Sequence, residues 1–203
     1  MSIFDAISVD PLSLRNELGI GNEKFVIGII GVFDKCKGHI FLFRAIESLV
    51  SEGIKNILCL VVGDGREGNQ LKDFIEQKKL TEYFKFLGYR NDIPKLLKTI
   101  DVVIVPSIQE SFPRVPLEAM AMKVPVIATN VGGLSESIDN GNTGIIIPPA
   151  NSNAIIKAIK YLMVNSEIRK QMGEAGRKRV ETCFTLHNNI RETEALYLDV
   201  LNK

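Results

Sequence analysis

Short runs of consecutive apolar residues, separated by longer helical patterns, most constrain how this 203-residue chain can fold. The runs at 25–32 and 57–62 are apolar at nearly every position rather than at every second one. Continuous runs are typical of parallel strands that helices cover on both faces. Strand–helix alternation along a chain is typical of α/β domains. We therefore predict a doubly wound α/β domain with a parallel sheet of about six strands and a helical C-terminal tail.

The expected elements follow from these runs and from the turn residues between them. Strands are predicted at 25–32, 57–62, 84–87, 101–105, 124–128 and 144–147. Helices are predicted at about 39–52, 69–79, 93–99, 116–122 and 134–139, with two or three more beyond about 151. A first short helix would have Asp10 as its N-cap, Pro11 at its first position and Gly19 at its end. The tail beyond Thr182 is the piece that we expect to be loosely attached.

Composition argues against several classes of protein. Lys and Arg number 25 against 24 Asp and Glu, so the chain lacks the basic excess of a nucleic-acid-binding domain. Two histidines and three cysteines without a C-x-x-C pair argue against a structural zinc site and a disulfide framework. No apolar run approaches the roughly 18 residues of a membrane span, and residues 1–10 show no signal-peptide pattern. We expect a cytoplasmic protein.

Ligands in doubly wound sheets bind beyond the carboxyl ends of the strands, so the loops there are the candidate sites. Residues 63–68 form a literal G-x-G-x-x-G. The dinucleotide fingerprint belongs after the first strand, and its partner acid should end the next strand. Here the motif follows the second strand, and no acid appears until Asp92. A glycine turn is the preferred interpretation, with a dinucleotide site as the alternative.

Two further loops have the residues to approach an anion. Residues 34–39 place Lys35, Lys37 and Gly38 at a helix start, where they could hold a phosphate or form a solvated basic turn. Gly132 and Gly133 allow the backbone to approach a ligand closely, or make a tight strand-to-helix turn.

The most informative loop runs from 106 to 121 and contains two glutamates eight positions apart. Glu110 lies in the loop and Glu118 in the first turn of the next helix, whose start Pro116 marks. Amides at such a start can hold an anion, and a carboxylate can accept hydrogen bonds from two adjacent sugar hydroxyls. Glu118 could instead be a surface acid that the helix dipole stabilises.

In combination, these segments resemble the C-terminal, donor-binding domain of glycosyltransferase family 4, the glycosyl transferases of group 1. The resemblance covers roughly 20–185 and depends on many short matches in the family's order rather than on any single motif. The matching residues are Gly31, Lys37-Gly38, Val62-Gly63-Asp64-Gly65, Gly88 to Ile93, Pro106-Ser107, Glu110-Ser111-Phe112, Glu118-Ala119-Met120-Ala121, Pro125-Val126-Ile127-Ala128-Thr129, Gly132-Gly133, Glu136, Gly141 and Gly144.

The resemblance implies one Rossmann-like half of a GT-B fold and retaining transfer of a sugar from a UDP- or GDP-linked donor, with neither metal nor cofactor. Glu110 would contact the donor sugar and Lys37 would neutralise the diphosphate, as the catalytic pair. Glu118 would accept hydrogen bonds from the ribose hydroxyls. The remaining substrate-binding positions would be Phe112, Pro113, Arg114 and Val115 at the phosphates or sugar, Gly31 and Gly63 in the flanking loops, Arg90 near the base, and Glu136 at the rim.

Two residues depart from the family pattern. Val32 stands where the family usually has an arginine, a loss of about 1.5–3 kcal/mol of phosphate binding unless Lys35 replaces it. Pro113 stands where many members have glycine, and proline lacks an N–H that could donate to a phosphate. A degenerate domain kept for interaction or regulation, or another enzyme such as a nucleotide-sugar epimerase, would be the alternative interpretations.

The length of the chain is the remaining departure. Residues 1–203 would form a single nucleotide-sugar-binding domain, and the N-terminal domain that holds the acceptor in this family would be missing. We expect that domain as a partner in cis or in trans, with any membrane contact made through it and with no nucleic-acid partner. The isolated chain is expected to bind donor but to transfer sugar poorly.

Overall fold

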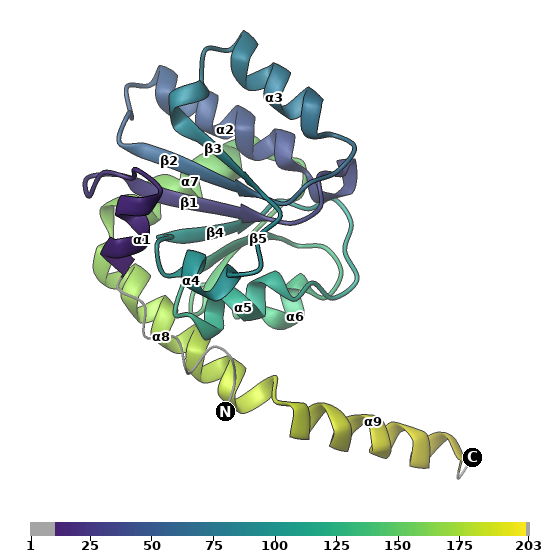
Figure 1. Cartoon of the computed structure of the whole chain (residues 1–203). Coiled ribbons are helices and arrows are strands. Elements are labelled where there is room, and N and C mark those ends of the chain that lie inside the picture. The colour runs from purple at the N-terminus through teal and green to yellow at the C-terminus, as the bar shows by residue number, and fades with distance from the viewer. Residues whose placement is uncertain (1–10, 202–203) are drawn as a thin grey trace.

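A parallel sheet of six strands, in the order β3-β2-β1-β4-β5-β6, organises residues 11–201, the part of the chain that the computed structural model describes (Figure 1). The strands are β1 (Phe25–Ile30), β2 (Ile57–Val62), β3 (Phe84–Gly88), β4 (Val102–Val105), β5 (Val126–Thr129) and β6 (Gly144–Ile147). The predicted doubly wound α/β fold is confirmed. The N-cap predicted at Asp10 lies outside the described residues.

Helices cover both faces of the sheet because its strands are apolar on both faces. One buried cluster joins the sheet to α2 (His39–Ser51), α3 (Gly68–Gln77) and α7 (Ser152–Val164). A second cluster, on the opposite face, joins it to α1 (Pro11–Glu17), α4 (Ile93–Leu97), α5 (Val115–Ala121) and α6 (Leu134–Ser137) (Figure 1). Leu42 and Leu49 of α2 and Met120 of α5, all fully buried, anchor these layers.

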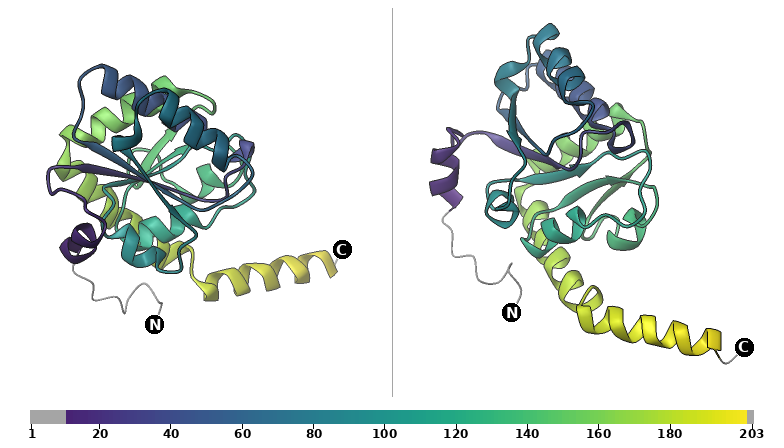
Figure 2. Two further views of the ribbon diagram at one scale, coloured as in Figure 1. Left: turned by 45° about the horizontal axis from the view of Figure 1, so that its top comes forward. Right: turned by 45° about the vertical axis from the view of Figure 1, so that its right-hand side comes forward.

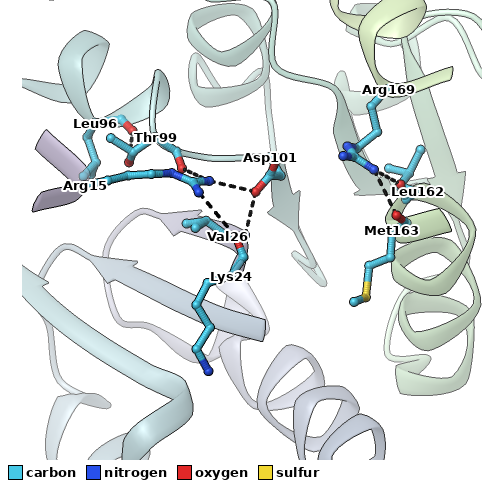
Figure 3. Close-up of polar contacts among 9 residues, drawn as sticks. All are labelled: Arg15, Lys24, Val26, Leu96, Thr99, Asp101, Leu162, Met163 and Arg169. Atoms are coloured by element: carbon cyan, nitrogen blue, oxygen red, sulfur yellow. Dashed lines mark hydrogen bonds and ion pairs between the residues drawn. The ribbon is translucent and has the colours of Figure 1, made fainter. Parts of the chain in front are cut away.

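The C-terminal helices differ in how they pack against the rest of the domain. In α8 (Ser166–Cys183), Gly176 lies against Met120 of α5, and the Arg177 guanidinium donates to the Ala121 carbonyl at 2.7 Å. Arg169, near the start of α8, donates to the Met163 carbonyl at 3.2 Å (Figure 3). By contrast, α9 (Leu186–Leu201) has no buried residue and extends away from the sheet (Figure 2). The loosely attached tail predicted beyond Thr182 is confirmed.

Polar contacts at the amino ends of the strands hold α1 in place. The Asp101 carboxylate, just before β4, accepts hydrogen bonds from the Val26 amide at 2.8 Å and from the Arg15 guanidinium at 3.1 Å (Figure 3). Arg15 also donates to the Thr99 carbonyl at 3.1 Å. These contacts lie at the edge of the sheet opposite to the loops that carry the candidate residues, so they serve the scaffold.

Two short 3-10 turns were not expected: η1 (Lys35–Lys37) and η2 (Thr81–Tyr83). The first forms because the Asp34 carboxylate accepts a hydrogen bond from the Cys36 amide at 3.0 Å, which turns the chain locally. β1 also ends at Ile30, two residues before the predicted end, and beyond it the chain stays hydrogen-bonded to β2 and the loop that follows: the Gly31 amide donates to the Val62 carbonyl at 2.9 Å and the Phe33 amide to the Asp64 carbonyl at 2.8 Å.

The loops after β1 and β4 meet because these two strands are neighbours at the point where the strand order reverses. The Ile108 amide donates to the Cys36 carbonyl at 2.7 Å, which joins the two loops directly. Gly38 has a φ of 66°, and a Cβ atom there would overlap the Pro106 carbonyl oxygen. Only glycine fits this close approach.

We expect Gly38→Ala to destabilise the domain more than the matched change Gly19→Ala. Gly19 has a similar φ of 61°, but its nearest neighbour, the Lys85 ammonium, would lie 3.9 Å from a new Cβ. Both variants gain backbone strain of about 1–2 kcal/mol, and only Gly38→Ala must also separate the two loops. Urea unfolding measures both; equal losses in the free energy of unfolding would contradict the tight-contact argument.

Candidate functional site

A cleft of about 660 Å³ lies at the carboxyl edge of the sheet, where the loops after β1, β2, β3 and β4 and the start of α5 converge. Its volume falls within the range of small-molecule sites. Of the residues predicted from the sequence, it is lined by Gly31, Lys37, Gly63, Arg90, Glu110, Pro113, Arg114, Val115 and Glu118. The structure thus brings most of the candidate residues together.

The strongest interaction in the cleft joins Lys37 to Glu110. The Lys37 Nζ lies 2.6 Å from Glu110 Oε1, and the Ser107 hydroxyl donates to the same oxygen at 2.8 Å. The Glu110 side chain is only 7% exposed and that of Lys37 is 28% exposed, so solvent screens this pair incompletely. Ser107 was not predicted as a site residue; its position three residues before Glu110 was the only available signal.

The glycine pair Gly132–Gly133 supports the Glu110 loop. A Cβ at Gly132, whose φ is 51°, would overlap the Glu110 carbonyl oxygen, and the Gly133 amide donates to the Ser111 carbonyl at 2.6 Å. The close backbone approach predicted for these glycines therefore exists, but it is made to the protein's own loop.

The G-x-G-x-x-G turn is likewise tied to a neighbouring loop. The Asp64 carbonyl accepts a hydrogen bond from the Phe33 amide at 2.8 Å, and the Glu67 amide donates to the Phe33 carbonyl at 3.0 Å. Gly63 lines the cleft at the start of this turn. These contacts support the interpretation of the motif as a glycine turn.

Glu118 lies half-buried in the first turn of α5, on the wall of the cleft. Burial raises the pKa of its carboxyl above the ordinary value, and the nearby Arg114 guanidinium opposes that rise. A carboxylate that is poorly solvated gains more from a hydrogen-bonding ligand than an exposed one does.

Tyr89 and Arg90, which follow β3, also line the cleft. Arg90 donates to both carboxylate oxygens of Asp92, at 2.7 and 2.6 Å, and this pairing raises the pKa of Arg90 and lowers that of Asp92. The guanidinium is therefore held in one orientation. Tyr89 is 81% exposed and was not predicted; an aromatic residue directly after the glycine that ends a strand was the available signal.

Two predicted substrate-binding residues do not line the cleft. The Phe112 ring packs against Phe184, with 6.0 Å between ring centroids. Glu136 is exposed on α6, and its carbonyl accepts a hydrogen bond from Arg179 at 2.8 Å.

Lys35 does not take the place of the arginine that is missing at Val32. Lys35 lines a neighbouring cavity of about 570 Å³ beside α2 and α3, whereas Val32 lines the cleft itself. The alternative that Lys35 substitutes is therefore not favoured, since η1 turns the chain between Lys35 and Lys37 and, of these two lysines, Lys37 is the one that lines the cleft. Arg90 and Arg114 are the other cations that line the cleft.

His39 is the most unusual polar group near the cleft. The residue is 3% exposed, and neither ring nitrogen has a hydrogen-bond partner among the described residues. Burial, together with the positive charge of Lys37, lowers its pKa to about 4, so the imidazole is neutral at physiological pH. It packs edge-on against the Phe33 ring at 5.2 Å.

Two other features are absent from residues 11–201, the described part of the chain. In that part of the chain, no group of three or more His, Cys, Asp or Glu side chains is placed to hold a metal ion. No helix in the same residues is long and apolar enough to cross a membrane.

The fold, a six-stranded parallel sheet with helices on both faces, is the Rossmann-like fold of GT-B glycosyltransferases. Residues 12–179 match the family described as "Glycosyl transferases group 1", and the chain belongs to that family.

Relatives of known name agree with this assignment. The chain is 31% identical to N-acetyl-alpha-D-glucosaminyl L-malate synthase of Bacillus anthracis, over 95% of this chain and 50% of that protein. It is 33% identical to the capsular polysaccharide biosynthesis glycosyltransferase CapM of Staphylococcus aureus, over 87% of this chain and 46% of that one. The chain therefore spans about half the length of the curated relatives that it matches.

The chain also spans about half the length of two solved structures that it matches. A glycosyltransferase from Rickettsia africae superposes with a TM-score of 0.86 at 28% identity, over 98% of this chain and 54% of that one. Anabaena HepE, solved in complex with UDP and glucose, superposes with a TM-score of 0.84 at 27% identity, over 95% of this chain and 53% of that one.

The raised pKa of Glu118 predicts a stability effect. Burial of the charged carboxylate destabilises the folded chain above the raised pKa, and this penalty disappears as pH falls toward the ordinary value of 4.5. Glu118→Gln, which mimics the protonated form, should therefore raise the free energy of unfolding at neutral pH and lose that advantage on acidification. Urea unfolding at both pH values, with the exposed Glu136→Gln as control, measures this difference; an advantage that stays constant with pH would contradict it.

Proposed function

We propose that this chain is the donor-binding half of a retaining, metal-independent glycosyltransferase that moves a sugar from a UDP- or GDP-linked donor to an acceptor. The observation that carries the proposal is the Lys37–Glu110 pair, held at 2.6 Å in the cleft by two interlocked loops. Such a pair offers a cation for a diphosphate and a carboxylate for sugar hydroxyls at adjacent positions.

The leaving group of the reaction would be a nucleoside diphosphate, which gains negative charge as the bond to the sugar breaks. Lys37 and Arg114, which both line the cleft, can stabilise that charge. Arg114 would thereby compensate in part for the absence of an arginine at Val32. Pro113, which has no N–H, leaves this task to the side-chain cations and the remaining amides of the loop.

The other cleft residues fit the rest of a nucleotide sugar. Glu118 would accept hydrogen bonds from the two ribose hydroxyls, and Tyr89 and Arg90 would lie beside the base. The binding of UDP and UDP-glucose by HepE supports a donor of this chemical class.

An acceptor-binding half, in cis or in trans, would complete the enzyme and would make any contact with a membrane; we place this donor half in the cytoplasm. Alone, the chain should bind donor and transfer little sugar, because nothing positions an acceptor against the donor. Robust transfer from a sugar nucleotide to an added acceptor by this chain alone would contradict that division of labour.

We expect the two glutamates to affect different parts of the donor. Glu118→Ala should weaken UDP and UDP-glucose alike, by about 1.5–3 kcal/mol, because it removes charge-assisted bonds to the ribose. Glu110→Ala should weaken UDP-glucose alone, because its carboxylate serves the sugar. Calorimetric titration of both variants, with Glu136→Ala as a control for loss of a surface carboxylate, provides the comparison.

Two outcomes would contradict these roles. Equal losses of UDP binding in both variants would remove the distinction between a ribose contact and a sugar contact. If UDP, its monophosphate and uridine bind equally well, the site does not recognise a diphosphate, and the degenerate module becomes the better description.

A further inference from the structure

Two hydrogen-bond donors contact the Glu110 carboxylate at a single oxygen. The Lys37 ammonium and the Ser107 hydroxyl both donate to Oε1, at 2.6 and 2.8 Å. Among the described residues, no hydrogen bond is made to Oε2. The carboxylate is thus fixed at one oxygen while the other remains available to a ligand in the cleft.

The two hydrogen bonds to Glu110 differ in how a bound nucleotide sugar would affect them. Lys37 is a flexible cation with three N–H groups, and under the proposed function a diphosphate competes with Glu110 for it. Ser107 is neutral and 1% exposed, and a diphosphate does not attract it by charge. When the diphosphate binds, the lysine contact to Glu110 is shared or lost, whereas the serine contact remains.

Ser107 is itself fixed by the neighbouring strand. The Thr129 hydroxyl, at the end of β5, donates to the Ser107 carbonyl at 2.6 Å. Thr129 is also buried, and Gly132 three residues later lies directly against the Glu110 carbonyl. The end of β5 therefore sets both the residue that holds Glu110 and the backbone of Glu110.

We propose that Ser107 is a positioning residue, which keeps Glu110 aimed at the donor sugar after the diphosphate has drawn Lys37 away. This inference rests on the proposed function and assigns a role to a residue that lines the cleft and acts through Glu110. It separates the roles of the two loops: Lys37, after β1, responds to the phosphates, and Ser107, after β4, preserves the geometry at the sugar.

The test uses the full chain and its Ser107→Ala variant. Ser137→Ala is the matched control, since Ser137 is equally buried and its hydroxyl donates only to the Leu134 carbonyl, at 2.9 Å. Ser107→Cys, which keeps the size but is a weak donor, is a second variant in case alanine disturbs folding. Calorimetric titration with UDP, UDP-glucose, GDP and GDP-glucose measures binding to each protein.

We expect Ser107→Ala to weaken the preferred sugar nucleotide about 5- to 20-fold while the matching free diphosphate changes by less than about two-fold. Ser107→Cys should show a smaller loss of the same kind, and Ser137→Ala should show none. In a Glu110→Ala background the additional loss from Ser107→Ala should vanish, because the hydroxyl acts only through that carboxylate.

Three results would contradict the role of Ser107, and a fourth would contradict the proposed function as well. A loss shared equally by sugar nucleotide and free diphosphate, a loss that persists in the Glu110→Ala background, or the absence of any loss would overturn the role of Ser107. If the unmodified chain binds none of the four probes, the proposed function fails and this inference fails with it.

Discussion

The close contact between the loops after β1 and β4 is the constraint on which the site depends. These strands are neighbours because the sheet reverses its order between them, so Lys37 and Glu110, 73 residues apart, lie side by side. Gly38 against the Pro106 carbonyl sets how near the loops come, and the Ile108–Cys36 hydrogen bond fixes their register. The buried apolar layers on both faces of the sheet make the strand ends rigid enough to hold that contact.

The cleft contains charged side chains that pair with each other and stabilise the chain, and others that are left for a ligand. Lys37 and Glu110 neutralise each other, which lowers the cost of keeping both partly buried. Glu118 has no comparable ion pair among the described residues, and its raised pKa reflects the cost of burying its charge. Under the proposed function, the hydroxyls and the diphosphate of one nucleotide sugar would satisfy all three groups.

Local sequence patterns predicted much of the fold and of the candidate site. The features that these patterns missed were missed for physical reasons. Apolar runs and the turn residues between them located all six strands, and the loops at their carboxyl ends contained most residues of the cleft. Strand order is non-local, so no local pattern could show that the loops of Lys37 and Glu110 touch. Phe112 was assigned to the site because of its neighbours in sequence, whereas its ring packs against Phe184. The Ser107–Glu110 hydrogen bond depends on loop geometry that spacing does not specify.

The most direct test of the account is calorimetric titration of the purified chain with UDP, GDP, ADP and NAD, without added metal. The account predicts saturable binding of one nucleoside diphosphate, because Lys37 and Glu118, the groups proposed to bind the diphosphate and the ribose, line one cleft at the edge of the sheet. Preferential binding of NAD, or no binding of any of the four, would contradict the claim that this half of the enzyme forms the donor site by itself.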